Sequence, residues 1–595
     1  MCRIAGIVNN HLPIEAIASQ VGEMCRLLKH GGPDDEGLFS EAESHLVLGN
    51  RRLALLDLSA AGHMPMVYAD RYVITYNGEL YNHLALREEL IALGHHFTNH
   101  TDTEVILAAF AQWNSQSFIK LKGMFAFALW DKTDKALFLV RDPAGIKPIY
   151  FSQFEGVLVF ASEVRAFKAS GQKYTSNKSW PVLQMAYGHL PEPVSTFNEI
   201  IPLPKGCFLH YQTTSNHYQL QSFSHYSYSS KINDTVVAVH ELKTAMQDAV
   251  NSHMMADAPV GVFLSGGLDS SIITQLAANK SLKALNTLSL YFEDDRFSEK
   301  KYQDLLITKL HCNHRQYLLQ ADDFLTALPT VLDAMDLPSC DGINTWFISK
   351  YAAENGLKAV LSGIGGDELF GGYPSFQRIG LASLLQQLPN LAIKLGKKTA
   401  SRKLNRMSYL KIAGIKGIYL FLRGHFTPHE IARHLDMDEK EVWQILESTP
   451  LMMDVDQLGQ KNQASWMEFN LYMQNQLLRD ADVMSMQNSV EIRVPFLDDA
   501  VVKLAHRMDA SVKYPGPLPK QLLINCFKDE LPSGIYNRPK MGFSFPFDEW
   551  LKESEMVKDL MSNGNKAVQK SYVAFMKGEM KWYQLMALIL QRKHI

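Results

Sequence analysis

The chain has 595 residues, of which 46% are hydrophobic and 20% charged, and its formal net charge is -3. This length exceeds the size at which one hydrophobic core keeps growing, so we expect two or more domains. The nearly balanced charge excludes the basic footprint of a nucleic-acid binder and a polybasic membrane patch, so the expected substrates are small molecules.

The first candidate functional residue is Cys2, which removal of Met1 would expose. Such a residue carries a thiol and a free α-amine on one carbon, with reference pKa values of about 8.5 and about 7.7 to 8.0. Because these values are closely matched, the amine can take the thiol proton, as it does for an N-terminal Thr nucleophile. Taken alone, a Cys at this position is more often only a small residue, so the hypothesis depends on the rest of the chain.

Short apolar or alternating runs broken by turns dominate residues 1 to about 205. Asn77-Gly78 predicts a turn after the first clear strand, and the next two strands predict a hairpin. Helical stretches lie between the strands, which favours layered sheets covered by helices. The clearest predicted elements are strands over 72–76, 124–130 and 136–140 and helices over 84–93 and 104–113.

The pattern of apolar residues changes at about residue 238. Helix-length amphipathic segments then alternate with short apolar strands, a pattern typical of a parallel, doubly wound sheet. A polar, Ser/Tyr-rich stretch over 211–234 separates the two regions. We therefore predict an α/β protein with two domains, 1–210 and 235–595. The predicted strands of the second domain are 260–264, 284–292 and 357–361.

The strongest local motif is a Gly-rich turn directly after the strand 260–264. Such a turn lets backbone N–H groups approach an oxyanion, and the positive end of the following helix, expected to begin near Ser270, favours its charge. The Gly-x-x-x-x-Gly-Lys-Ser/Thr spacing of kinases and GTPases is absent. An ordinary strand-to-helix turn is the alternative, but the flanking Ser and Asp residues favour phosphate. The predicted phosphate-binding residues are Leu264, Ser265, Gly266, Gly267, Asp269 and Ser270.

A second Gly-rich loop, 361–373, also follows a strand of the buried type. Because ligands lie beyond the carboxyl ends of parallel strands, both loops are expected to face one crevice, with Ser362 and Gly363 beside the ligand. Asp269 and Asp367 would then hold Mg²⁺ against nucleotide phosphates, since this ion takes one or two carboxylates plus phosphate oxygens. The alternative is that each Asp only caps a helix.

A cationic, turn-rich segment over 538–543 lies farther along the chain. Within it, Lys540 would neutralise phosphate charge, whereas the alternative is an ordinary surface loop.

These motifs together resemble those of glutamine-dependent asparagine synthetases of the bacterial type, over nearly the whole chain. The matching segments of the first domain are Met1-Cys2, His-Gly-Gly-Pro-Asp at 30–34, Arg-Arg-Leu at 51–53, Tyr-Asn-Gly-Glu-Leu-Tyr-Asn at 76–82, Thr-Asp-Thr-Glu at 101–104 and Arg-Asp-Pro-Ala-Gly-Ile-Lys-Pro at 141–148. Those of the second domain are the two Gly-rich loops, Val-Glu-Ile-Arg-Val-Pro-Phe-Leu-Asp at 490–498 and Arg-Pro-Lys at 538–540. So many matches in one order are specific for the superfamily.

The resemblance implies an N-terminal-nucleophile glutaminase of layered αββα architecture, joined to a synthetase domain of the ATP-pyrophosphatase type. Cys2 would attack the glutamine amide, and the Asn77 side chain with the Gly78 backbone N–H would bind the oxyanion. The charges of the implied pocket residues are opposite to those of the glutamine groups that they would bind. Its glutamine-binding residues are Asn77 itself, Arg52 for the carboxylate, and Glu79 and Asp102 for the amino group.

The resemblance also implies that the released ammonia passes internally to the second domain. There ATP, bound as a substrate with Mg²⁺ as cofactor, would adenylate a carboxylate and leave pyrophosphate, with Lys540 as a catalytic residue. The implied overall reaction converts L-aspartate, ATP, L-glutamine and water to L-asparagine, AMP, pyrophosphate and L-glutamate.

Two positions depart from the family pattern. Family members commonly have Arg where this chain has Gly31, so the support of the glutaminase pocket differs. At the position of Ile364, well-known members have an acidic residue thought to take a proton from ammonia, and Ile cannot do so. One alternative is therefore an amidotransferase for another carboxylate, in surface-polymer or secondary-metabolite assembly. A non-catalytic nucleotide sensor or scaffold is a third hypothesis, disfavoured by the intact residues Cys2, Asp269, Asp367 and Lys540.

The remaining features point to the cytoplasm. The six Cys have no disulfide framework spacing, as expected for reduced thiols. His311-Cys312-Asn313-His314 resembles a zinc cluster, but neighbouring residues of a helix point to different sides and no second pair lies nearby. No apolar run approaches the roughly 18 to 20 residues of a membrane span. The sequence leaves open the oligomeric state, with a homodimer as one alternative, and the role of the largely helical stretch 381–463.

Overall fold

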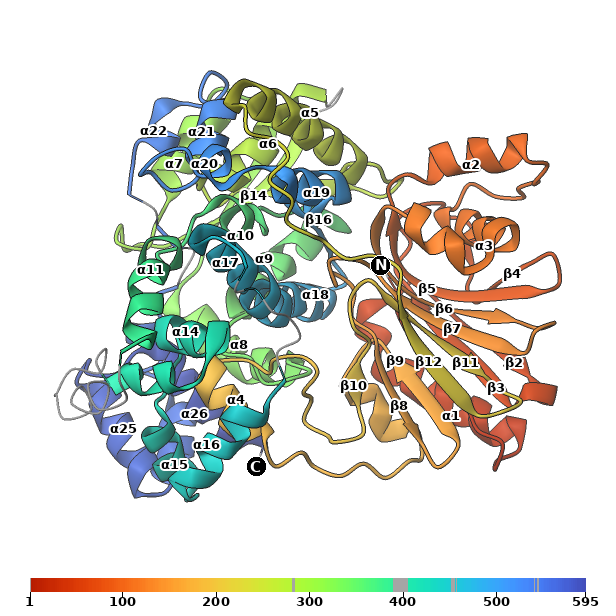
Figure 1. Ribbon diagram of the computed structural model, residues 1–595, viewed down its shortest axis with the longest axis horizontal. Helices are drawn as coiled ribbons and strands as arrows, with labels where there is room; N and C mark the ends of the chain where they lie inside the picture. The colour runs from red at the N-terminus through yellow and green to blue at the C-terminus, as the bar shows by residue number, and fades with distance from the viewer. Residues whose placement is uncertain are drawn as a thin grey trace.

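The computed structural model describes residues 2–280, 284–388, 405–450, 455, 457–539, 541–542 and 545–594. Figure 1 shows two α/β bodies side by side, with the N-terminal sheets on one side and the helix-rich remainder on the other. None of the helices in these ranges has the length and apolar content of a membrane span.

The first body is built on two antiparallel six-stranded sheets. The first sheet has the order β10 (Ile201–Pro202), β8 (Tyr150–Phe154), β9 (Val157–Ala161), β1 (Arg3–Val8), β3 (Leu46–Arg52), β2 (Asp35–Glu41). The second has the order β12 (His217–Ser222), β11 (Cys207–Gln212), β7 (Ala136–Arg141), β6 (Gly123–Asp131), β5 (Tyr72–Leu80), β4 (Met66–Tyr68). The last strand of that sheet, β12, lies beyond residue 210, where the sequence placed the end of the first domain.

Helices cover the outer faces of both sheets. The helix α1 (Ile14–Leu27) packs on β1 and β3, and α3 (Asp102–Trp113), beside α2 (His83–Ala92), packs on β5. Between the sheets lies a core that includes the fully buried Trp130. The four layers are therefore helix, sheet, sheet and helix, as the sequence predicts.

The predicted hairpin is confirmed by β6 and β7, which pair from Ala126↔Arg141 to Asp131↔Ala136. The predicted turn at Asn77-Gly78 is wrong. Both residues continue β5 and pair with Ala126 and Phe125 of β6. A Cβ at Gly78 would lie 2.2 Å from the Met124 carbonyl oxygen, so glycine is needed here for close approach of two strands and not for a turn.

The second body contains a parallel five-stranded sheet, which confirms the predicted architecture. Its order is β15 (Cys312–Leu318), β14 (Leu285–Tyr291), β13 (Val260–Phe263), β16 (Ala359–Leu361), β17 (Glu491–Arg493). The chain starts at the central strand, adds two strands on one side and then two on the other. The direction of winding therefore reverses between β13 and β16, and this is the point at which such sheets bind ligands.

Helices surround this sheet. The first half of the set is α5 (Thr235–His253), α6 (Leu268–Lys280), α7 (Lys300–Ile307), α8 (Ala321–Ala334), α9 (Ile343–Glu354), α10 (Gly366–Phe370), α11 (Ser375–Gln386), α14 (Gly414–Arg423), α15 (Pro428–Leu435), α16 (Glu439–Ser448) and α17 (Gln460–Met467). A π-helical stretch, Glu468–Leu478, joins α17 to α18 (Arg479–Met486). The remaining helices are α19 (Asp499–Arg507), α20 (Ala510–Lys513), α21 (Gln521–Phe527), α22 (Ser533–Tyr536), α23 (Phe547–Trp550), α24 (Glu555–Ser562), α25 (Lys566–Met576) and α26 (Trp582–His594).

One helix of the N-terminal region packs against the second body instead of the first. The helix α4 (Trp180–Tyr187) packs against α15, α16 and α26 (Figure 1). The Gln591 side chain of α26 donates to the Pro181 carbonyl at 3.1 Å and to Gln184 Oε1 at 2.8 Å. The two bodies are thus interlocked and not merely adjacent.

Candidate active site

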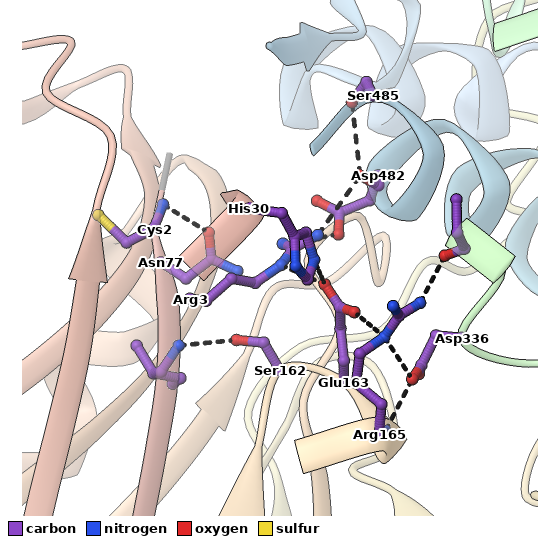
Figure 2. A network of polar contacts seen from close by, with 12 residues as sticks. Cys2, Arg3, His30, Asn77, Ser162, Glu163, Arg165, Asp336, Asp482 and Ser485 are labelled. Carbon is purple, nitrogen blue, oxygen red and sulfur yellow. Dashed lines mark hydrogen bonds and ion pairs between the residues drawn. The ribbon is translucent and has the colours of Figure 1, made fainter. Parts of the chain in front are cut away.

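Cys2 lies immediately before β1 and is buried. Its backbone nitrogen donates to Asn77 Oδ1 at 3.3 Å, a contact from the first sheet to the second (Figure 2). Burial raises the pKa of the Cys2 thiol, while a hydrogen bond from the Leu53 backbone and the charge of Arg52 act in the opposite direction. A buried thiol of this kind needs a base before it can attack as a thiolate.

The Asn77 side chain has one unused donor. Its Oδ1 accepts from Cys2, whereas its buried Nδ2 has no hydrogen-bond partner in the structure. A buried, unsatisfied amide donor costs about 1–3 kcal/mol, so its retention beside a thiol needs an explanation. A negatively charged oxygen at this point would satisfy it.

Arg52 ends β3 and is buried, but its guanidinium faces a neighbouring loop. It donates to the carbonyl oxygens of Leu56 at 3.2 Å, Asp57 at 2.5 Å and Ser59 at 3.1 Å. In this arrangement Arg52 fixes the loop that follows β3. The predicted contact with a glutamine carboxylate would be made in addition to these bonds or in place of some of them.

Asp102 and Glu79 both lie near Asn77 in the fold, at the start of α3 and within β5. Asp102 Oδ2 accepts from the Tyr76 hydroxyl and from the Leu80 backbone nitrogen, each at 2.9 Å. Glu79 Oε1 lies 3.1 Å from Nη2 of Arg493, which belongs to β17 of the second body. The first body therefore reaches the parallel sheet through Glu79, a residue predicted to bind glutamine.

A buried charge network joins the two bodies near Cys2 (Figure 2). Arg3 Nε lies 2.7 Å from Glu163 Oε1, and Arg3 Nη1 lies 2.9 Å from Asp482 Oδ2 in α18. Lys147 Nζ lies 3.4 Å from the other oxygen of Asp482. Every one of these side chains is nearly fully buried, so the Asp482 charge of the second body is compensated by cations of the first.

The same network continues through Arg165, whose Nε lies 2.8 Å from Glu163 Oε2 and 3.5 Å from Asp336 Oδ1. Asp336 follows α8 and also accepts from the backbone nitrogens of Val164 and Arg165. The departure at Gly31 has a structural reason here. A Cβ at residue 31 would lie 2.6 Å from Cγ of Arg3, so Arg3 takes up the space beside that glycine.

The first Gly-rich loop follows β13, as predicted, and its helix α6 begins at Leu268, two residues before the expected Ser270. Gly266 has a φ of +88°, a conformation that favours glycine. Ser265 Oγ lies 3.0 Å from Ser270 Oγ and accepts from the Gly267 backbone nitrogen at 3.2 Å. These bonds form a compact turn directly before the positive end of α6.

The second loop follows β16, the strand next to β13, so the two loops meet at the edge where the winding reverses. They are in direct contact. A Cβ at Gly363 would lie 2.9 Å from Asp269 Cβ, and a Cβ at Gly366 would lie 2.6 Å from Asp269 Cγ. Glycine at both positions lets the second loop lie against the carboxylate of the first.

Lys520 joins the two predicted carboxylates. Its Nζ lies 2.7 Å from Asp269 Oδ2 and 2.6 Å from Asp367 Oδ1. Desolvation would lower the pKa of Lys520, but the charges of Asp269 and Asp367 raise it above its usual value. With a φ of +55°, Lys520 also occupies a backbone region that is sparsely populated by residues other than glycine.

No sequence motif pointed to Lys520. It stands in Leu-Pro-Lys-Gln at 518–521, outside the predicted loops, and 251 positions from Asp269. The predicted Lys540 lies outside the described residues. Its neighbour Arg538 donates to the Gly266 carbonyl at 2.8 Å and forms an ion pair with Glu299. The segment around Arg538 thus lies against the first Gly-rich loop.

Asp269 and Asp367 together provide the donor set that suits Mg²⁺ at a nucleotide, two carboxylates that converge at the edge of a parallel sheet. No cluster of three or more His, Cys, Asp or Glu side chains with metal-binding geometry occurs among the described residues. Cys312 and His314 of the superficial zinc motif lie on β15, a strand and not the expected helix.

The second Gly-rich loop contains Ile364, where a proton acceptor was expected, and the carboxylate of Glu368. Ile364 is half-buried and packs against the main hydrophobic core. Glu368 is buried, and its two oxygens accept from the Gly365 backbone nitrogen at 3.0 Å and the Tyr373 hydroxyl at 2.7 Å. Both Glu368 oxygens thus support the loop from within.

Comparison with known proteins matches both halves of the chain. Residues 241–580 match the family model described as asparagine synthase, and residues 1–224 match that of a glutamine amidotransferase domain. The chain is 30% identical to asparagine synthetase [glutamine-hydrolyzing] 1 of Bacillus subtilis, over 96% of this chain and 92% of that protein. Asparagine synthetase [glutamine-hydrolyzing] 3 of the same organism is 28% identical over 94% and 91%. Asparagine synthetase B [glutamine-hydrolyzing] of Escherichia coli is 30% identical over 65% and 67%.

Proposed function

The chain belongs to the glutamine-hydrolysing asparagine synthetase family of ligases, and on this premise we propose that it makes L-asparagine from L-aspartate, ATP and L-glutamine. The observation that carries the proposal is the pairing, in one chain, of a buried cysteine beside an unsatisfied amide donor with two Gly-rich loops whose carboxylates converge. The first supports hydrolysis of an amide, and the second supports activation by a nucleotide.

In the proposed first reaction, the α-amine exposed by removal of Met1 takes the Cys2 proton and the thiolate attacks the glutamine amide carbon. The oxyanion receives hydrogen bonds from Asn77 Nδ2 and the Gly78 N–H, and such donors contribute several kcal/mol. Collapse of the intermediate expels ammonia, and water then releases glutamate from the thioester. The unsatisfied Asn77 donor supports this role.

In the proposed second reaction, the aspartate side-chain carboxylate attacks the α-phosphorus of ATP and displaces pyrophosphate. The backbone of the loops at 264–270 and 362–363 cradles the phosphates, and Lys520, with Lys540, neutralises their charge. Asp269 and Asp367 would hold Mg²⁺, which supplies charge neutralisation on the phosphates when bound. Ammonia from the first site then displaces AMP from the acyl-adenylate. Adenylation is needed because a carboxylate oxygen is a poor leaving group whereas AMP is a good one.

A second candidate function is favoured by Ile364. An aliphatic side chain at the loop position that faces the acceptor in the proposed site suits a larger or more apolar carboxylate than aspartate. The enzyme would then be a related ATP-dependent amidotransferase.

An acceptor screen separates these proposals. The purified full-length enzyme is given glutamine, ATP and Mg²⁺ with aspartate or one of a panel of carboxylates, and pyrophosphate release is measured. Aspartate-dependent release with formation of asparagine is the expected result. No release with aspartate, but release with another carboxylate, would establish the second candidate instead.

A further inference from the structure

One arginine contacts both proposed sites. Arg493 ends β17 and is fully buried. Its carbonyl oxygen accepts a 2.8 Å hydrogen bond from the backbone nitrogen of Ser362, which directly follows β16 at the start of the second Gly-rich loop. Its Nη2 lies 3.1 Å from Oε1 of Glu79, in the proposed glutamine pocket. Arg493 is therefore the one residue between this contact with the proposed nucleotide loop and this contact with the proposed glutamine pocket.

The second body alone sets the position of this guanidinium. Arg493 Nε lies 2.5 Å from Glu491 Oε1, and Nη1 donates to the carbonyl oxygens of His253 at 2.8 Å and Met255 at 2.6 Å. These three partners come from β17 and from the end of α5. With Nε and Nη1 held in this way, Nη2 is presented to Glu79 in a fixed direction, because a guanidinium is planar.

The charge of Glu79 depends on this contact. Burial raises the pKa of Glu79 well above its usual range, and the nearby Arg493 guanidinium is the largest influence that lowers it. The other charged groups that act on Glu79 are the carboxylates of Glu491 and Asp102, which raise its pKa. A carboxylate that binds the amino group of a substrate must be ionised to do so.

We propose that Arg493 is a positioning residue for glutamine hydrolysis: it aligns the Glu79 carboxylate for the substrate amino group and ties that carboxylate to the start of the nucleotide loop. The inference rests on the proposed roles of Glu79 and of the loop that begins at Ser362. It extends them, because it makes the glutamine pocket depend on a residue of the synthetase half.

The test variant is Arg493→Lys in the full-length enzyme. Lysine keeps a positive charge, but its compact ammonium cannot reach two carboxylates and two carbonyl oxygens at once. We expect the KM for glutamine, measured as glutamate release, to rise at least about tenfold. Synthesis from ammonium salts should stay within about threefold of the wild-type rate. Because Glu79 then binds its proton more readily, the KM for glutamine should climb as the pH falls from 8.5 to 6.5, more steeply than in the wild type.

Arg141→Lys is the matched control. Arg141 is likewise a buried guanidinium in a strand, held by Glu192 and by the carbonyl oxygens of Lys147, Gly145 and Leu203. It does not contact Glu79. A comparable loss of thermal stability with no steeper pH dependence of the glutamine KM is expected for this control.

Glu79→Gln, measured in parallel, separates the proposed role of Glu79 from the proposed role of Arg493. If Glu79→Gln leaves the glutamine KM unchanged, the proposed role of Glu79 fails. If Glu79→Gln raises the KM and Arg493→Lys does not, the role of Glu79 stands and the inference about Arg493 is overturned. Equal loss of glutamine-dependent and ammonia-dependent activity in Arg493→Lys, without a pH effect on KM, would assign Arg493 a purely structural role and would also overturn it.

Discussion

The two proposed sites differ in the partners of their buried carboxylates. In the N-terminal half, Asp102 and Glu79 are enclosed between layers and each has a fixed protein partner, Tyr76 and Arg493. In the C-terminal half, Asp269 and Asp367 share one cation, Lys520, at the end of the parallel sheet where the two Gly-rich loops meet. A preformed pocket suits a small substrate of constant shape, whereas a lysine between two carboxylates is a group that a polyphosphate with its cation can rearrange. The proposed glutamine site is thus built on separate ion and hydrogen-bond pairs, whereas the proposed nucleotide site, called the adjustable site below, has a shared cation that a ligand can displace.

The largest expected effect follows from removal of the proposed nucleophile, which should separate the two sites. Cys2→Ala should abolish glutamate release from glutamine, because the thiol forms the covalent intermediate. Synthesis from ammonium salts should persist within a few-fold, since the second site does not use the thiol. Both rates are measured with the same enzyme preparation.

Cys25→Ala is the control for this change. Cys25 is a buried thiol in the same body, and burial raises its pKa to about 12. This variant should keep glutamine hydrolysis. Loss of both activities in a folded Cys2→Ala protein, or retention of its glutaminase, would remove Cys2 from the mechanism.

The next largest effect concerns the adjustable site. Asp269→Asn and Asp367→Asn keep the shape of each side chain and remove its charge. Pyrophosphate release should fall by at least about two orders of magnitude, in line with the several kcal/mol that metal-based charge stabilisation supplies. Glutamine hydrolysis should survive. Asp304→Asn, on α7 and paired with Lys300, is the control and should leave both rates unchanged. Undiminished ATP turnover in either site variant would exclude that carboxylate from the site.

A third prediction concerns the buried network between the bodies. Arg3→Gly leaves Asp482 and Glu163 without one cation, and breaking a buried ion pair costs about 3–5 kcal/mol. The thermal midpoint, followed by circular dichroism, should therefore fall by several degrees. Because positions 3 and 31 compete for one space, Gly31→Arg alone should also destabilise, whereas the double variant Arg3→Gly, Gly31→Arg should recover part of the loss. Additive losses in the double variant would contradict this explanation.

The smallest expected effect is at Ile364. If aspartate is the acceptor, Ile364→Glu should be tolerated and should raise the ammonia-dependent kcat/KM for aspartate by a few-fold, because a proton acceptor is added beside the attacking nitrogen. If the acceptor is larger and apolar, a carboxylate here should weaken its binding, since burying a charge without a partner is costly. The measurement is kcat/KM for aspartate and for the best alternative acceptor, in wild type and variant. Turnover of aspartate by the wild type at an ordinary enzymatic rate would exclude the alternative acceptor.

Local patterns predicted much of this molecule. Short apolar runs marked β13, β14 and β16, and the Gly-rich turns after two of them marked the edge of the sheet at which the winding reverses. The pair Asn77-Gly78 misled, because the dipeptide that favours a hairpin turn also serves where two strands approach closely. The composition of a segment does not say which of these two uses the chain makes of it.

Contacts between residues far apart in the sequence could not be predicted from local patterns. Lys520 has no distinguishing neighbours in the sequence, and only the fold brings it to Asp269 and Asp367. The motif around Arg493 resembles the family pattern, but the contact of Arg493 with Glu79 depends on how the two bodies dock. A periodic pattern carries information on the face of an element and none on which distant element covers it.

The displaced helix α4 has a consequence for the synthesis of the protein. Its buried side chains Trp180, Leu183 and Tyr187 rest on elements that include α26, and the bond from Gln591 to Gln184 spans 407 positions. At about 5–20 residues per second, the ribosome needs about 20 to 80 s to make that stretch. For most of this interval the helix is outside the ribosome while the α26 part of its cover has not been translated. The helix therefore cannot complete its packing until synthesis of the chain is nearly finished.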